Sequence, residues 1–136
     1  MKTVRPTSSY QLQLPDEIRE STDTRVSSFW IEGEPLLLQT SSHLRIEGQQ
    51  ISAEQRLEER LAKRRDWERR TSNLCLDPAV DQAAAEQQID GLIWIHAYFV
   101  WTHLTVYVTM SGPAEVVHDP NSWARTALRS LSLSLQ

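Results

Sequence analysis

The sequence predicts an α+β fold, with a single antiparallel β-sheet of about six strands and two main helices packed on it. Three observations predict this fold. Alternating runs rich in β-branched and aromatic residues indicate strands, two segments of strong helix formers interrupt them, and tight turn signals join neighbouring strands. No repeat or linker divides the 136 residues, so we expect a single domain over 1–136, with 1–9 as a flexible N-terminal tail.

The first strands are expected in the N-terminal third. The segment "YQLQLP" (10–15) alternates and stops at a proline, as a short strand does. Residues 26–48 look like two more strands that turn at 32–34, where a glycine lies between two glutamates.

A helix is expected in "ISAEQRLEERLAKRRDWERR" (51–70). Ser52 with Gln55 three residues later forms a capping box, and strong helix formers follow. Its apolar stripe is narrow and consists of Ala53, Leu57 and Leu61. Such a stripe implies a helix that lies on the protein surface.

The most apolar stretch is "GLIWIHAYFVWTHLTVYVTM" (91–110). Two histidines and three threonines interrupt it and no basic residues flank it, so we interpret it as two strands and not as a membrane span. A turn at Thr102-His103 would put only apolar pairs on one face. The other face would be mixed, with Trp94, His96, Tyr98 and Val100 opposite Ser111, Thr109, Tyr107 and Thr105.

Asp90-Gly91 is a strong hairpin signal, so residues 82–111 are predicted to form a three-stranded meander. We expect a three-residue loop there. It would place Ala85 and Gln87 of the preceding strand on the apolar face. Glu86 and Gln88 would then lie on the mixed face.

The two long connections are expected at 71–81 and 111–122, and a last helix after them. Residues 119–122 offer several N-cap choices for that helix. Its apolar face would hold Trp123, Ala127, Leu128 and Leu131, and "LSLSLQ" at the end alternates like a short strand.

Charge and composition exclude several classes. A net charge of −4 argues against nucleic acid as the partner, and the basic run within 54–70 carries a net charge of only +2. The N-terminus lacks an apolar segment after its basic residues, which predicts a cytoplasmic location. A single cysteine, Cys75, suits a reducing compartment, and we interpret it as a buried inert thiol.

The sequence indicates no catalytic residue, metal site or cofactor. The four histidines match no metal-ligand spacing, and no GxSxG motif or glycine-rich phosphate loop occurs. Glu86 and His96 could pair across the first hairpin, which leaves a small hydrolase as an alternative.

The mixed face of the meander is the candidate partner-binding surface, because tryptophan and tyrosine anchor interfaces. The candidate residues are Trp94, His96, Tyr98 and Tyr107. The alternative is that a helix or the N-terminal strands cover this face as a second half of the core.

The segments "SAEQRLEERLAKR", "LTVYVTMSGP" and "SWARTALRSLSL", in this order after the early strands, resemble the PsbP-like fold. Within that fold, the chain is similar to the small Eag-type chaperones of bacterial type VI secretion. The resemblance covers about residues 10–135 and implies a cytoplasmic, non-catalytic homodimer that shields the transmembrane segments of a secreted effector. The chain lacks a Gly-Trp dipeptide between Tyr10 and Val26, which leaves open an immunity protein that neutralises a toxin.

These observations together predict a non-catalytic protein-binding module, a chaperone or adaptor for a bacterial secreted effector. The expected partner is another protein, and neither nucleic acid nor direct membrane insertion is expected.

Overall fold

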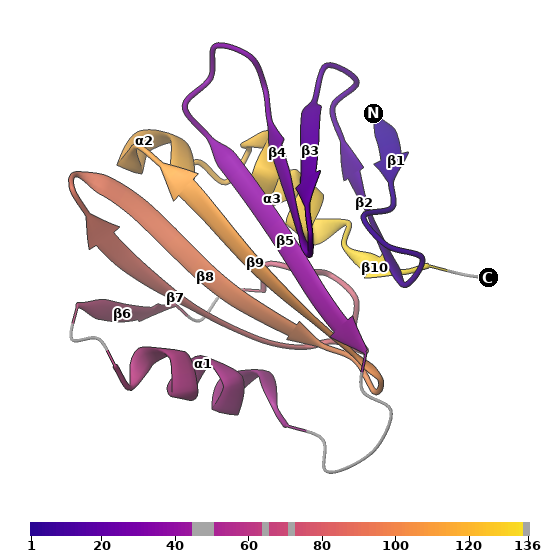
Figure 1. The fold of residues 1–136 in the computed structure, drawn as a ribbon. Coiled ribbons are helices and arrows are strands. Elements are labelled where there is room, and N and C mark those ends of the chain that lie inside the picture. The colour runs from indigo at the N-terminus through magenta and orange to yellow at the C-terminus, as the bar shows by residue number, and fades with distance from the viewer. Residues whose placement is uncertain (45–50, 64–65, 71–72, 135–136) are drawn as a thin grey trace.

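Seven antiparallel strands form the main sheet of this computed structural model, which describes residues 1–44, 51–63, 66–70 and 73–134 (Figure 1). Their order across the sheet is β3 (Arg19–Asp23), β4 (Val26–Trp30), β5 (Leu37–Leu44), β9 (Leu104–Gly112), β8 (Leu92–Val100), β7 (Asp81–Ile89) and β6 (Trp67–Arg70).

A second, three-stranded antiparallel sheet consists of β1 (Lys2–Val4), β2 (Tyr10–Leu14) and β10 (Ser132–Leu133), with β2 in the middle. The α+β class is therefore confirmed, but the prediction of a single sheet of about six strands is wrong. Residues 2–4, expected within the flexible tail, pair with β2. The separate sheet forms because β2 pairs with β1 and β10, while its apolar side chains pack on the main sheet.

Within the described ranges, three helices accompany the sheets: α1 (Ala53–Leu61), α2 (Ala114–Val117) and α3 (Trp123–Arg129). In Figure 1, α2 and α3 lie behind the main sheet and α1 lies on the opposite side, over β7 and β8. The main core fills the inner face, between the sheet and the layer of β2, α2 and α3. No helix in the described ranges is both long and apolar enough to cross a membrane.

The register of the β8–β9 hairpin is the one predicted. Trp94 lies opposite Ser111 and Tyr98 opposite Tyr107. The backbone N–H of Trp101 donates to the carbonyl of Leu104 at 2.8 Å and closes the turn at residues 102–103. The apolar face of the hairpin therefore enters the main core, and the mixed face lies on the outer side.

The β7–β8 turn differs from the prediction. Asp90 and Gly91 have φ angles of 50° and 80°, as in a two-residue type I′ turn, and Ile89 lies opposite Leu92. The expected three-residue loop is one residue too long. Because side chains alternate along a strand, this difference moves every residue of β7 to the other face, Glu86 included.

The helix α1 begins where the capping box predicts, with the Ser52 side chain accepting from the Gln55 backbone N–H at 3.0 Å. It ends at Leu61, although helix formers continue to residue 70. Residues 67–70 instead form β6, because pairing with β7 satisfies their backbone and Trp67 joins the apolar cluster under α1. Tertiary pairing overrides the local helix propensity here.

The C-terminal predictions hold. The side chain of Ser122 caps α3, and the two-residue β10 follows it and pairs with β2. The connection at 111–122 also contains α2, which the sequence did not suggest.

Replacing Gly91 with alanine tests the two-residue turn. No atom lies within 4 Å of the added Cβ, so the cost comes from the positive φ angle, and we expect a loss of about 1–2 kcal/mol in the free energy of unfolding. Chemical denaturation measures this loss. The matched control is Asp90→Asn, which should change the free energy of unfolding little because asparagine tolerates the left-handed region. An unchanged stability of Gly91→Ala would contradict the turn.

Candidate functional site

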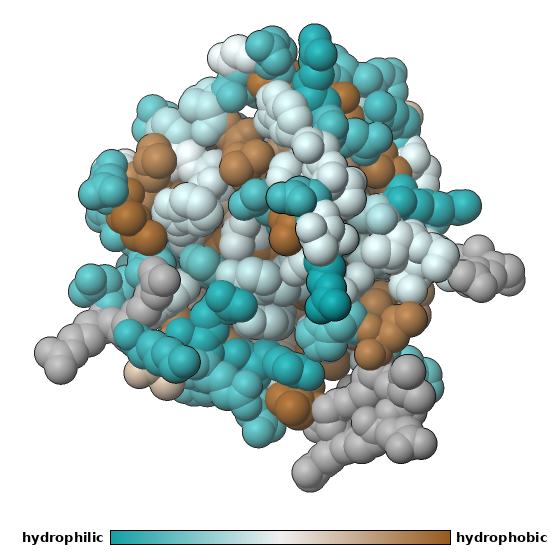
Figure 2. Space-filling model, in the orientation of Figure 1, coloured by the Kyte–Doolittle hydropathy of each residue, from teal (hydrophilic) through white to brown (hydrophobic). Residues whose placement is uncertain are grey.

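The outer face of the main sheet is the candidate functional surface, because α1 covers it only in part (Figure 1). Leu57 of α1 packs on Ala85 and Tyr98, so the helix closes the face only over the parts of β7 and β8 that carry these residues. Figure 1 shows no described element in front of β4, β5 and β9. Figure 2 shows this open half as a mostly pale surface with a few brown patches, bordered by hydrophilic side chains.

Four side chains form a row across the open half of the face. The register places Trp30 opposite Leu37, Leu37 opposite Ser111, and Ser111 opposite Trp94. We call these four residues the tryptophan row. Trp30, Leu37 and Trp94 are each half-buried, so all three keep accessible apolar surface. Strands that are far apart in the sequence thus bring two indole rings to one open surface.

A parallel row lies beside it on β4, β5, β9 and β8, and consists of Ser28, Gln39, Thr109 and His96. The Gln39 amide donates to Ser28 at 3.0 Å and accepts from Thr109 at 3.4 Å. Much of the polar capacity of this row is therefore satisfied within the protein.

The four residues predicted to bind a partner do not share one environment. Tyr98 is 7% exposed and lies under α1, as the half-core interpretation expected. His96 and Tyr107 lie at the border of α1, joined by a hydrogen bond of 2.5 Å between Nδ1 and the phenol oxygen. Trp94 lies on the open half. The structure therefore places Trp94 in the tryptophan row and the other three residues at or under α1.

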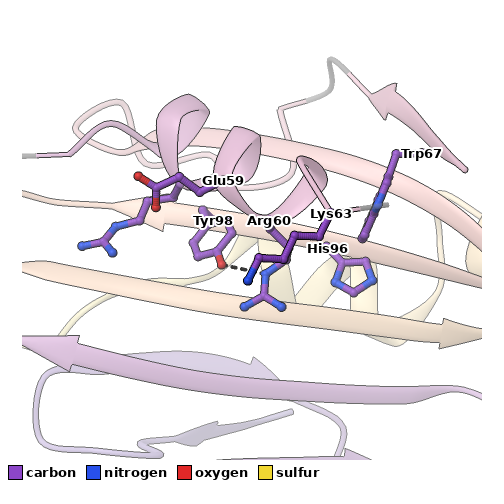
Figure 3. Close-up of a pocket in the computed structure, with 7 residues that line it drawn as sticks. Glu59, Arg60, Lys63, Trp67, His96 and Tyr98 are labelled. Carbon is purple, nitrogen blue, oxygen red and sulfur yellow. Dashed lines mark hydrogen bonds between the residues drawn. The ribbon is translucent and has the colours of Figure 1, made fainter. Parts of the chain in front are cut away.

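A hollow of about 390 Å³ lies between α1 and the sheet (Figure 3). Its lining combines aromatic and cationic side chains, and consists of Arg56, Glu59, Arg60, Lys63, Trp67, His96 and Tyr98. The Arg60 Nε donates to the Tyr98 hydroxyl at 2.8 Å, and its guanidinium carbon lies 4.1 Å from the centre of the Tyr107 ring. This stacking fixes the guanidinium beside the sheet.

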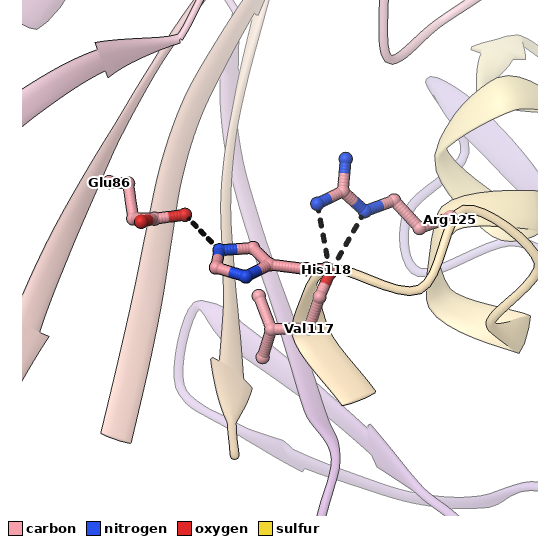
Figure 4. Close-up of polar contacts among 4 residues, drawn as sticks. All are labelled: Glu86, Val117, His118 and Arg125. Carbon is pink, nitrogen blue, oxygen red and sulfur yellow. Dashed lines mark hydrogen bonds and ion pairs between the residues drawn. The ribbon is translucent and has the colours of Figure 1, made fainter. Parts of the chain in front are cut away.

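Glu86 does not face His96, so the predicted carboxylate–imidazole pair is wrong. Glu86 lies on the inner face because of the two-residue turn, and there its carboxylate contacts His118 Nε2 at 2.5 Å (Figure 4). Arg125 of α3 donates from Nε and Nη2 to the carbonyl of Val117 at 3.1 and 2.8 Å. These contacts tie β7, α2 and α3 together.

The single cysteine lies in the core, as predicted. Cys75 is buried, and its thiol donates to the carbonyl of Leu131 at 3.2 Å. Burial raises the pKa of this thiol, which keeps it protonated and unreactive. Among the described residues, no three His, Cys, Asp or Glu side chains gather closely enough to hold a metal ion.

Comparisons with known proteins reveal a shared fold but no family. No family model and no curated protein matches the sequence. A crystal structure from Bacteroides thetaiotaomicron VPI-5482 superimposes with a TM-score of 0.59 at 11% identity, over 93% of this chain and 46% of that one. The chain thus spans about half the length of this neighbour, and the likeness concerns the fold alone.

Sequence reasoning missed several residues of this surface. The prediction from sequence places Trp30 and Leu37 in strands but on no particular face of the sheet. The alternation of "VSSFW" could have shown the face of Trp30, because it puts Trp30 on the same side as Ser28. Trp67 and Arg60 were assigned to one long exposed helix. Only the return of the chain as β6 brings Trp67 to the edge of the hollow.

Alkylation of Cys75 tests its buried state. At pH 8, the folded protein should react with iodoacetamide at least about tenfold more slowly than the denatured protein, because burial raises the thiol pKa above its ordinary value of 9.0. A folded-state pKa that is raised also stabilises the protein below the unfolded pKa, and this contribution is lost as the pH rises through the folded pKa. Cys75→Ser controls for other reactions, and equal rates in the two states would contradict the assignment.

Proposed function

We propose that this protein is a non-catalytic protein-binding module, a chaperone or adaptor for a bacterial secreted effector, and that its partner lies on the tryptophan row. The observation that carries the proposal is the row itself: Trp30 and Trp94 flank Leu37 on the half of the outer face that α1 leaves open. Tryptophan is enriched among the residues that dominate binding energy at interfaces.

The charge pattern of the open face supports this proposal. None of the eight positions in the tryptophan row and the parallel row is Asp, Glu, Lys or Arg. Interface cores are depleted of charged residues in the same way, since covering an unpaired charge is costly. The free-energy cost of desolvating this surface is therefore low.

The dimensions of the row suit a helical segment. Neighbouring strands lie about 4.8 Å apart, so the three spacings from β4 to β8 separate Trp30 from Trp94 by about 14 Å. An α-helix covers that length with about ten residues, close to three turns. A helix with an apolar face would bury Leu37 at its centre and contact both indoles, which is the chemistry of a hydrophobic segment of an effector.

The finer features that the resemblance implies belong to the same proposal. A hydrophobic segment needs cover before export, and a cytoplasmic homodimer would offer two such faces. An immunity protein would instead bind one folded toxin domain, and the uncharged face gives that role less support than the chaperone role.

Co-purification from the native host tests the proposed function. The tagged wild-type protein should retain a secreted protein with apolar helices, identified by mass spectrometry. The double substitution Trp30→Ser and Trp94→Ser should reduce its recovery at least about tenfold, because it removes both anchors.

The matched control is Leu76→Ser, which changes a residue that is 67% exposed and lies outside the tryptophan row. Recovery with this control should equal that of the wild type, and thermal unfolding verifies that all variants fold. Capture of a single soluble toxin that is insensitive to the double substitution would overturn the chaperone proposal.

A further inference from the structure

The hollow beside α1 concentrates positive charge in an acidic protein. Its lining holds three cations and one carboxylate, a sum of +2, whereas the whole chain carries −4. Arg56, Arg60 and Lys63 are spaced four and three residues apart, so they extend from one side of the helix. None of the three forms an ion pair within the described residues. Like charges at this spacing repel one another, and a bound anion would offset the repulsion.

Arg60 is positioned to bind an oxyanion. Its Nε donates to Tyr98, and its guanidinium lies over Tyr107, so the side chain is held in one orientation. Its two Nη groups make no hydrogen bond within the described residues. A planar guanidinium with free Nη donors binds a carboxylate or phosphate through two parallel hydrogen bonds. Figure 3 shows Arg60 and Lys63 reaching over the sheet, with the Glu59 carboxylate directed away from them.

The other end of the hollow is aromatic. Trp67 and His96 meet edge to face, with ring centres 4.5 Å apart. The indole N–H of Trp67 and the Nε of Arg56 are buried without a hydrogen-bond partner in the described part of the chain. Unsatisfied buried donors are uncommon and costly, and an incoming acceptor would relieve that cost after a small side-chain adjustment.

We infer that this hollow binds a small organic anion in which a carboxylate or phosphate is attached to a planar ring. The oxyanion lies against Arg60 and Lys63, and the ring lies toward Trp67 and His96. The volume of about 390 Å³ falls within the range of small-molecule sites. This inference is independent of the proposed partner-binding role, which uses the tryptophan row on the open half of the sheet.

A nuclear magnetic resonance titration of the full chain tests this inference. The probes are benzoate, phenyl phosphate, inorganic phosphate and the neutral benzamide. Benzoate or phenyl phosphate should shift the Trp67 indole N–H resonance in a saturable manner, and Trp67→Phe assigns that resonance among the five tryptophans. Whichever of benzoate and phenyl phosphate binds with the higher affinity identifies the preferred oxyanion, carboxylate or phosphate.

Two variants locate the charge. Arg60→Gln should weaken the affinity at least tenfold, and Lys63→Gln, at an exposed position that makes no hydrogen bond within the described residues, should weaken it at least threefold without affecting folding. Arg25→Gln, an exposed arginine at the β3–β4 turn, is the matched control and should leave the affinity unchanged.

Three results would overturn the inference. The first is the absence of a saturable shift with both aromatic anions. The second is that benzamide binds as well as benzoate, which would show that the charge plays no role, or that inorganic phosphate binds as well as phenyl phosphate, which would show that the ring plays no role. The third is an equal loss of affinity in Arg25→Gln and Lys63→Gln.

Discussion

The register of the β8–β9 hairpin is the constraint on which the rest of the structure depends. Because successive side chains point to opposite faces, a single register sends Phe99 and Val106 into the main core and Trp94 and Tyr107 to the outer side. A slip of one residue would place tyrosine and histidine in the main core and move the apolar set to the outer face. The cost of that exchange, about 1.5–3 kcal/mol for each large apolar side chain, makes the register highly specific. Neighbouring strands then inherit their facing from this pair.

The two faces of the sheet are completed differently. The inner face is closed by β2, α2 and α3. The contact of Glu86 with His118 connects β7 to the end of α2, and the contact of Arg125 with Val117 connects α3 to α2. In the described part of the chain, the outer face receives one short helix, whose narrow apolar stripe covers only part of β7 and β8. This partial cover of the outer face creates both features with functional potential. They are an uncharged aromatic surface beyond the helix and a cationic hollow at the border of the helix. The proposed roles therefore follow from what α1 leaves uncovered.

The sequence was most informative where a pattern had a single solution. The pairs of the β8–β9 hairpin are apolar throughout on one face, so their register was predictable. In "QAAAEQQI", by contrast, three consecutive alanines suit either face, and only the φ angles of Asp90 and Gly91 decide where Glu86 points. Residues 67–70 have the composition of a helix and form a strand because β7 offers an unpaired edge. The tryptophan row depends on long-range pairing of β4, β5 and β9, which local patterns do not encode.

Oxidative footprinting of the tryptophans in the purified complex tests directly whether the partner covers the tryptophan row. Modification of Trp30 and Trp94 is measured by mass spectrometry in the free protein and with the captured partner, and Trp101, which is 4% exposed, serves as the internal control. We expect strong protection of Trp30 and Trp94 by the partner and no change at Trp101. Equal modification of Trp30 and Trp94 in the free and bound states would show that the partner binds elsewhere and would contradict binding at the tryptophan row.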